Sequence, residues 1–165
     1  MNLYLLRHGL AVEPDERSFS KDSERPLTAK GETKLVQITS AMVALDLTFD
    51  AILSSPYIRA RQTAEIVADA FRARAKIKFT ETLTPSGNPR KLIELIHHLG
   101  CQDPLLVSHE PFLSEFISFL VAGSSGFPVT MKKSGFCKLS LETLRYGPCA
   151  TLEWLLTPKQ LLLMA

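Results

Sequence analysis

Cysteine is scarce in this chain of 165 residues, and its distribution excludes two kinds of stabilisation. The three cysteines, Cys101, Cys137 and Cys149, are odd in number and widely spaced, and none belongs to a Cys-x-x-Cys pair. Disulfide-rich small proteins and structural zinc sites use paired or closely spaced cysteines. We therefore expect reduced thiols in a cytoplasmic protein, with neither a disulfide framework nor a structural zinc ion.

A strong charge of one sign and long hydrophobic runs are also lacking. Nineteen Lys and Arg against 17 Asp and Glu leave a net charge of +2, too small for a protein that binds nucleic acid or a membrane surface through its overall charge. The longest apolar segment, residues 116–122, is far shorter than the roughly 20 residues of a membrane helix. No basic region precedes the short apolar run at the start, as it would in a secretory signal. We expect neither nucleic acid nor membrane as a partner, so any anion site must be local.

The chain does contain enough apolar sequence for a substantial core. Hydrophobic residues make up 45% of its 165 residues, and domains cluster at about 100 to 150 residues. We therefore expect one domain over residues 1–165.

Short apolar runs alternate with helical spacing along the chain. The expected strands are residues 3–6, 51–54, 76–79 at the sheet edge, 104–108, 136–141, and 151–156, the last antiparallel to its neighbour. The expected helices follow Thr28 as N-cap, follow Ser55 as N-cap with Pro56 at the first helical position, and cover residues 91–99 and 112–120. This alternation predicts an α/β fold with a mostly parallel sheet.

Chemistry-bearing residues follow the most apolar of these strands. Arg7, His8 and Gly9 come directly after the first strand, and in open α/β sheets the ligand crevice lies outside the carboxyl ends of the strands. Arg7 and His8 would then lie at its floor, while Gly9 would let the backbone turn and a ligand approach. An isolated Arg-His-Gly is more often an ordinary loop, so this interpretation needs support from other segments.

Two further strand-to-helix junctions supply that support. Arg59 is expected in the first turn of a helix, where the dipole and the free N–H groups favour a bound anion and a cation is out of place without one. His109 follows the strand at residues 104–108 in the same way. Arg7, His8, Arg59 and His109 are therefore expected at one edge of the sheet.

Other polar segments offer weaker signals. Residues 13–25 form a long loop beside His8, and loops of this length often act as lids or binding segments. Arg25, at its end, would contact substrate or else form a surface ion pair. Lys132 and Lys133 would form a cationic rim for an acidic partner protein, or simply be solvated. The tail at residues 161–164 would pack on the body, whereas its exposure would indicate a dimer contact.

Three segments together resemble the histidine phosphatase superfamily, which has the phosphoglycerate mutase-like fold. They are Leu6-Arg7-His8-Gly9, residues 55–64 (SPYIRARQTA) and residues 107–111 (VSHEP). The short chain, residues 25–28 (RPLT) and residues 83–87 (LTPSG) are most similar to SixA-type phosphohistidine phosphatases. The resemblance implies a three-layer α/β/α sandwich whose mostly parallel sheet has one antiparallel strand.

The resemblance also implies the roles of the site residues. His8 would be the nucleophile, and Arg7, Arg59 and His109 would form a phosphate pocket. A neutral imidazole is nucleophilic near pH 7, and we expect a backbone carbonyl to hold its other nitrogen. Guanidinium groups stabilise the charge that spreads over the transferring phosphoryl oxygens, so neither a metal nor a cofactor is expected.

Glu110 directly follows the second histidine, where branched phytase and acid-phosphatase members of the superfamily carry a proton donor. It would have that role here, or would only favour the dipole of the next helix. The region at residues 81–85 has no match to the acidic segment of mutases, which disfavours a mutase. The absence of a dedicated acid suits a labile phosphoramidate.

The leading hypothesis is a metal-independent phosphatase that removes phosphate from protein phosphohistidine, for example on a phosphotransfer domain of a signalling relay. Inorganic phosphate would be its product. One alternative is a phosphatase for small phosphomonoesters such as a sugar phosphate. Another is a phosphate-binding module without turnover.

Overall fold

One six-stranded sheet forms the centre of the computed structural model, which describes residues 1–14 and 21–165. Its strands are β1 (Asn2–Arg7), β2 (Ile52–Ser54), β3 (Ile77–Phe79), β4 (Leu105–Ser108), β5 (Phe136–Ser140) and β6 (Thr151–Leu156), in spatial order β3-β2-β4-β1-β5-β6. Strands β1 to β4 are parallel, whereas β5 is antiparallel to both of its neighbours. The predicted edge position of β3 and the antiparallel pairing of β6 are therefore confirmed, and the single reversed strand is β5.

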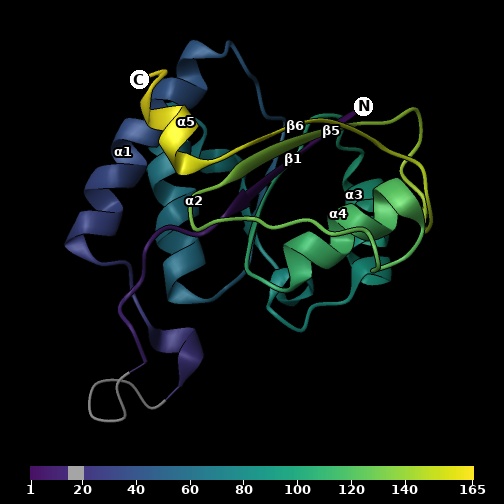
Figure 1. Cartoon of the computed structure of the whole chain (residues 1–165), viewed down its shortest axis with the longest axis horizontal. Helices are drawn as coiled ribbons and strands as arrows, with labels where there is room; N and C mark the ends of the chain where they lie inside the picture. The colour runs from purple at the N-terminus through teal and green to yellow at the C-terminus, as the bar shows by residue number, and fades with distance from the viewer. Residues whose placement is uncertain (15–20) are drawn as a thin grey trace.

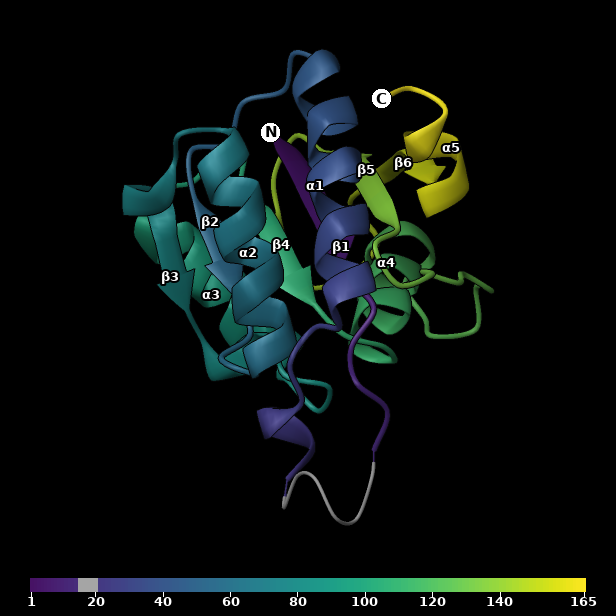
Figure 2. The same ribbon diagram turned by 90° about the vertical axis from the view of Figure 1, so that its left-hand side faces the viewer.

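Helices cover both faces of the sheet and make three layers (Figures 1 and 2). Helices α1 (Ala29–Ala44), α2 (Ile58–Ala70) and α5 (Pro158–Leu162) lie on one face, and α3 (Pro89–Leu99) and α4 (Phe112–Ala122) on the other. Short 3₁₀ helices, η1 (Asp22–Glu24), η2 (Arg74–Lys76) and η3 (Glu81–Leu83), lie in the connections. The α/β/α sandwich is confirmed, and no helix in the described ranges is long and apolar enough to cross a membrane.

Strand β1 joins the two halves of the core. Leu3 and Leu5 pack in the apolar cluster under α3 and α4, whereas Tyr4 and Leu6 pack in the cluster under α1 and α2. Side chains alternate between the faces of a strand, so a strand covered on both sides is apolar throughout. The residues that follow β1 are therefore held by a strand that is buried on both faces.

Two helix starts test the capping predictions. Thr28 is the N-cap of α1, because its side chain accepts a hydrogen bond from the Gly31 N–H at 2.9 Å. The prediction of Ser55 as N-cap is wrong: α2 begins at Ile58 with Tyr57 as N-cap. The Ser55 hydroxyl instead accepts from the Tyr57 N–H at 3.3 Å, which stabilises the turn between β2 and the helix. Arg59 still lies in the first turn of α2.

Gly9 allows close packing of its neighbours against the backbone. A Cβ atom there would lie 2.5 Å from Leu35 Cδ1 of α1 and 3.2 Å from Leu27 Cδ2. The Gly9 N–H donates to the Thr63 hydroxyl of α2 at 3.1 Å. Because α1 comes so close, only glycine fits at the exit of β1.

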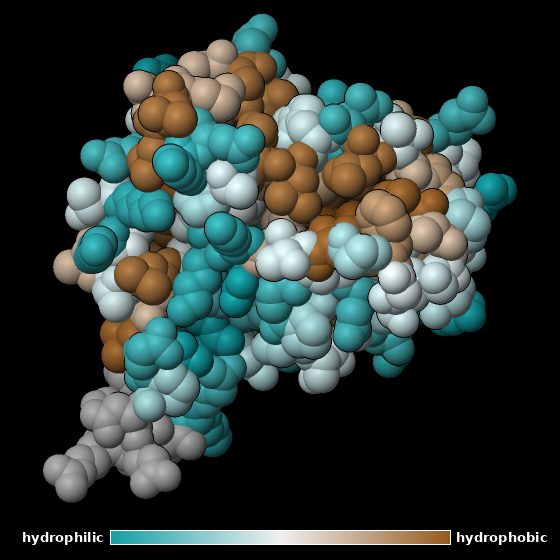
Figure 3. Space-filling model, in the orientation of Figure 1, coloured by the Kyte–Doolittle hydropathy of each residue, from teal (hydrophilic) through white to brown (hydrophobic). Residues whose placement is uncertain are grey.

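The C-terminal tail packs on the body only in part. Leu161 is buried in the core cluster shared by α1 and α2, as predicted. Leu163 is 80% exposed and Met164 is also exposed. Figure 3 shows apolar side chains at the end of the molecule where α1 and α5 lie.

Candidate active site

The predicted site residues surround one cavity of about 350 Å³. It lies at the carboxyl edge of the parallel strands. The arrowheads of β2 and β4 point toward this edge in Figure 2, and η1 lies there too. The residues that line it are Arg7, His8, Glu13, Pro14, Asp22, Arg25, Arg59, Pro85, His109, Glu110 and Lys133. Three segments far apart in the sequence therefore meet here, as the three junctions predicted.

Hydrogen bonds at both ring nitrogens hold His8 in one tautomer. Its Nδ1 lies 2.7 Å from the Gly9 carbonyl oxygen, and Arg59 Nε donates to its Nε2 at 3.2 Å. A guanidinium in a protein stays protonated and can only donate. His8 Nε2 is therefore the unprotonated nitrogen, whose lone pair accepts from Arg59, and Nδ1 carries the proton donated to Gly9, which agrees with the expected backbone carbonyl.

The environment of His8 also keeps the ring neutral. Burial is the main cause that lowers its pKa to about 3, and the positive charges of Arg59 and Arg7 act in the same direction, while the hydrogen bond to Gly9 opposes them. A buried imidazole next to cations resists protonation because its charged form would lose water and be repelled. Near neutral pH, Nε2 is thus unprotonated.

Arg59 is almost fully buried, and its guanidinium group joins three neighbours. Besides its bond to His8, its Nη1 donates to the Asp22 carbonyl oxygen at 2.6 Å and its Nη2 to the Asp22 carboxylate at 2.8 Å. The guanidinium carbon lies 5.3 Å from the centre of the Tyr57 ring. The side chain is therefore held with its Nε directed at His8 Nε2.

Arg7 is anchored by the segment that precedes β5. Its Nη1 donates to the Met131 carbonyl oxygen at 2.7 Å. The Ser134 N–H approaches the carbonyl oxygens of both Arg7 and His8 at 3.1 Å. No local motif in the sequence signals this support, because it comes from a segment more than 120 residues away.

His109 faces His8 across the cavity, with ring centres 5.0 Å apart. Its other face meets the edge of the Tyr57 ring, also at 5.0 Å between centres. Burial, followed by the nearby His8 and Arg59, lowers the pKa of His109 well below its usual range. The ring is therefore neutral and can donate one hydrogen bond into the cavity.

Glu110 lies beside His109 and is partly shielded from water. The Ser114 hydroxyl donates to one oxygen of its carboxylate. Burial raises the pKa of Glu110, and the hydrogen bond from Ser114 and the charge of Arg7 only partly oppose this. The carboxyl group therefore holds a proton to a higher pH than an exposed glutamate.

Unpartnered buried polar atoms gather around this cavity. Within residues 1–14 and 21–165, the buried side-chain atoms without a hydrogen-bond partner are Arg7 Nε, His109 Nδ1 and Nε2, and Glu110 Oε1. Leaving such an atom unpaired in a dry interior costs about 1–3 kcal/mol. Their grouping in one cavity, beside two guanidinium groups, indicates a site arranged for a bound anion.

Asp22 is the site residue that the sequence analysis missed. Its carboxylate pairs with Arg59 at 2.8 Å and with Arg25 at 2.6 Å. Burial works to raise the pKa of Asp22, but the hydrogen bonds and charges of the two arginines together lower it. The signal that could have found it is the opposite charge of Arg25 three residues later. A carboxylate thus occupies part of the anion site of Arg59.

The remaining predicted cations have mixed outcomes. Arg25 lines the cavity, but it also donates from Nε to the Val12 carbonyl oxygen at 2.7 Å and pairs with Asp22. It therefore fixes the segment around η1. Lys133 lines the cavity and lies 3.3 Å from Glu13, whereas Lys132 is exposed and is not among the residues that line it.

The described residues form neither a metal cluster nor a disulfide. They contain no group of three or more His, Cys, Asp or Glu side chains that could hold a metal ion. Cys101 and Cys137 are buried free thiols, and Cys149 is also free. The polar character of the cavity therefore comes from arginine, histidine and single carboxylates.

Known proteins share both the motifs and the fold. The model of the histidine phosphatase superfamily (branch 1) matches residues 3–84. An uncharacterised protein of Picosynechococcus is 35% identical over 142 residues, with 84% of each chain covered. The phosphohistidine phosphatase SixA homolog of Haemophilus influenzae is 34% identical over 132 residues, covering 73% of this chain and 77% of its own.

A solved structure extends the likeness to nearly the whole chain. The protein histidine phosphatase SixA complexed with tungstate superposes with a TM-score of 0.83 at 26% identity, covering 98% of this chain and 99% of that one. The sequence relatives and the shared fold thus indicate the same family as the motif residues at the carboxyl edge of the sheet. The chain belongs to the histidine phosphatase superfamily and is a phosphatase of its SixA type.

Proposed function

We propose that this phosphatase removes phosphate from phosphohistidine on a protein, through a phosphorylated His8 and without a metal. The observation that carries the proposal is the unprotonated His8 Nε2, which accepts from Arg59, in a cavity with two guanidinium groups and an unpartnered imidazole. Phosphoryl transfer needs mainly positioning and charge stabilisation, which these groups supply. The tungstate bound to the SixA relative is itself a tetrahedral oxyanion.

In the first step, His8 Nε2 attacks phosphorus. The new N–P bond forms as the bond between phosphorus and the substrate imidazole breaks. The substrate ring takes up one proton from solvent water, so that it leaves as neutral imidazole. Arg7, Arg59 and His109 donate to the three equatorial oxygens, on which the negative charge spreads. The phosphorylated His8 ring becomes cationic, and the hydrogen bond from Nδ1 to the Gly9 carbonyl stabilises that charge.

In the second step, water attacks the phosphorus of phospho-His8. The bond to Nε2 breaks, the ring recovers its lone pair, and inorganic phosphate leaves. Because the pKa of His8 is about 3, the ring released in this step stays neutral near pH 7 and is ready for the next cycle.

Two arginines already provide positive charge for the phosphoryl oxygens, which supports the proposal that no metal ion is needed. We also expect the protein to act in the cytoplasm, since all three thiols are free and two of them are buried.

A phosphatase for small phosphomonoesters is the second candidate, and Glu110 favours it. An alkyl ester needs its leaving oxygen protonated, and burial raises the pKa of Glu110 as such a donor requires. A phosphohistidine has a more labile bond and a leaving imidazole, so it depends less on this acid.

Glu110→Gln distinguishes the two uses of the site. If Glu110 donates a proton, the variant lowers kcat/KM for an alkyl phosphate about 100-fold. Hydrolysis of p-nitrophenyl phosphate, which has a good leaving group, changes little. The wild-type rate on the alkyl ester falls as pH rises through the raised pKa of Glu110, and the variant lacks this decline. An equal loss on both substrates would show that Glu110 only positions its neighbours.

Asp22→Asn tests whether the carboxylate competes with phosphate for Arg59. Removing one negative charge next to the anion site should lower the inhibition constant of inorganic phosphate about three- to tenfold, most clearly at low salt. The matched control is Asp69→Asn, since Asp69 also pairs with an arginine, Arg74, but is exposed and is not among the residues that line the cavity. An unchanged or weaker inhibition by phosphate in Asp22→Asn would contradict this role.

The proposed function is tested by comparing three substrates. Purified protein is given a histidine-phosphorylated phosphotransfer domain, free phosphoramidate and p-nitrophenyl phosphate, with and without a chelator. We expect kcat/KM for the phosphorylated domain to exceed the others by about 100-fold, since part of its binding energy is used at the transition state, and the chelator to have no effect. A preference for a small ester would overturn the proposal in favour of the second candidate.

A further inference from the structure

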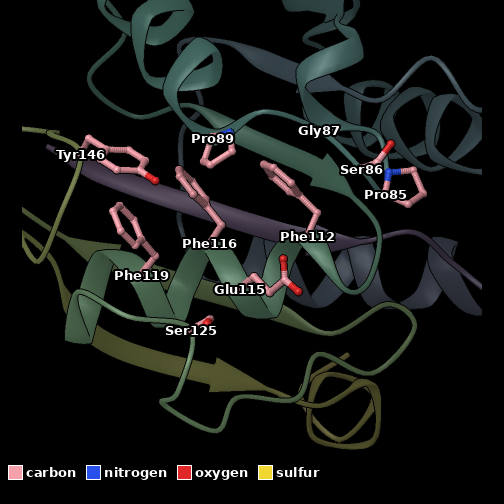
Figure 4. A pocket seen from close by; sticks show the side chains of 10 residues that line it. All are labelled: Pro85, Ser86, Gly87, Pro89, Phe112, Glu115, Phe116, Phe119, Ser125 and Tyr146. Carbon is pink, nitrogen blue, oxygen red and sulfur yellow. The ribbon is translucent and has the colours of Figure 1, made fainter.

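A second hollow opens beside the catalytic cavity and has a different character. Its volume is about 340 Å³. Phe112, Phe116 and Phe119 of α4 form one wall, Tyr146 lies next to them, and the loop at residues 85–89 faces them (Figure 4). We call this hollow the aromatic groove.

The aromatic groove adjoins the catalytic cavity. Pro85 lines both. Phe112, which lines the groove, begins α4 three residues after His109, which lines the catalytic cavity. A molecule whose phosphoryl group is held at His8 therefore has the groove beside it, on the side of Pro85 and Phe112.

The aromatic rings and polar rim of the groove suit an apolar side chain that is flanked by polar groups. The rings of Phe119 and Tyr146 lie 4.2 Å apart between centres, and the Arg90 guanidinium stacks on Tyr146 at 3.4 Å. Glu115 and Ser125 also line the groove. An apolar floor of packed aromatic rings with a polar rim is the arrangement found at the energetic centre of protein interfaces.

A small polar metabolite would find few partners on the floor of this groove. The buried unpartnered polar atoms of the described chain line the catalytic cavity, and none belongs to a residue of the groove. The polar side chains of the groove, Ser86, Glu115, Ser125 and Tyr146, are exposed, whereas its phenylalanine rings offer a sugar hydroxyl no hydrogen bond. The aromatic rings instead match an apolar side chain of the substrate protein. Because Pro85 lines both the groove and the catalytic cavity, this side chain would lie near the phosphohistidine.

We propose that the aromatic groove receives an apolar side chain of the substrate protein that lies close to its phosphohistidine. The inference rests on the proposed function and adds to it a rule for choosing the substrate. Burying one large apolar side chain corresponds to about ten- to a hundredfold in KM. A free phosphoramidate or aryl ester cannot use this contact.

Two variants and one control test the groove. Tyr146→Ala removes an exposed part of its wall, and Ser125→Trp fills it from an exposed position. Phe79→Ala is the matched control, because Phe79 is 44% exposed against 42% for Tyr146 and also carries a stacked arginine, but it lies on β3 outside the groove. Circular dichroism and thermal unfolding verify that each variant folds.

The first measurement compares a histidine-phosphorylated phosphotransfer domain with p-nitrophenyl phosphate. We expect Tyr146→Ala and Ser125→Trp to raise KM for the domain about tenfold and to leave the rate on p-nitrophenyl phosphate unchanged. Phe79→Ala should match the wild type on both. Equal losses on both substrates, or the same loss in the control, would overturn the proposal.

The second measurement uses synthetic phosphohistidine peptides. Each has serine at the five positions on either side of the phosphohistidine, with phenylalanine at one of them in turn. We expect the wild type to prefer phenylalanine at one or two positions by about tenfold in kcat/KM, and Ser125→Trp to lose that preference. Activity on all the peptides without any preference would overturn the groove inference and leave the proposed function intact. No wild-type activity on either the domain or the peptides would instead overturn both.

Discussion

Replacing His8 with asparagine should lower kcat by about 10⁴-fold or more, as expected when a covalent nucleophile is removed. The amide cannot accept a phosphoryl group, although it can still bond to the Gly9 carbonyl that now accepts from Nδ1. The fold should persist because β1 is anchored by core residues on both faces. The measurement is single-turnover hydrolysis of a ³²P-labelled phosphohistidine domain, followed by trapping of the labelled enzyme.

The trapped species gives the sharper readout. The wild type should carry label that is stable in alkali and lost in acid, as phosphohistidine is, whereas His8→Asn should carry none. His97→Asn is a suitable control, since His97 is also held by a backbone oxygen, that of Leu144 at 2.8 Å, but is not part of the cavity. Label retained on His8→Asn, or turnover near the wild-type rate, would remove His8 from the role of nucleophile.

Replacing Arg59 with lysine should lower kcat/KM about 10²- to 10³-fold, as loss of a preorganised donor to a developing anion does. The guanidinium group of Arg59 donates to His8 Nε2, to the backbone carbonyl oxygen of Asp22 and to one carboxylate oxygen of Asp22. A single ammonium group cannot keep that geometry while it also binds phosphoryl oxygens. Inhibition by inorganic phosphate should weaken in parallel, because the product binds the same group.

Arg61→Lys is the matched control for this prediction. Arg61 lies on the same helix, but it is half exposed and its ion pair with Glu65 is a loose 3.8 Å. Such a pair contributes little, so activity should stay near the wild-type value. If Arg59→Lys behaved like Arg61→Lys, the proposed contact of Arg59 with the phosphoryl group would be wrong.

The residues of the site could be predicted because parallel strands place their ends at one edge. Arg7, Arg59 and His109 each follow a strand of the chain's most apolar kind, and β1, β2 and β4 are neighbours in the sheet. Local sequence signals are sufficient for such junctions, since each depends on one strand and the turn after it.

Other features depend on segments that are distant in sequence. Asp22 is positioned in the site by its ion pair with Arg59, 37 residues later in the sequence. Gly9 lacks a side chain where Leu35 of α1 packs against the backbone. Ser55 looked like an N-cap on local grounds, but the path of the chain from β2 to α2 moved the helix start to Ile58. Tertiary packing overrides local preference in each case.

The sequence by itself determined the order of strands and helices, the α/β class and the residues that meet at the sheet edge, because these follow from apolar periodicity and strand direction. Only the tertiary structure decided the tautomer of His8, the pairing of Asp22 with Arg59 and the aromatic groove beside Pro85. These depend on distances of a few ångströms between side chains from separate elements, and such distances are set by how the layers pack.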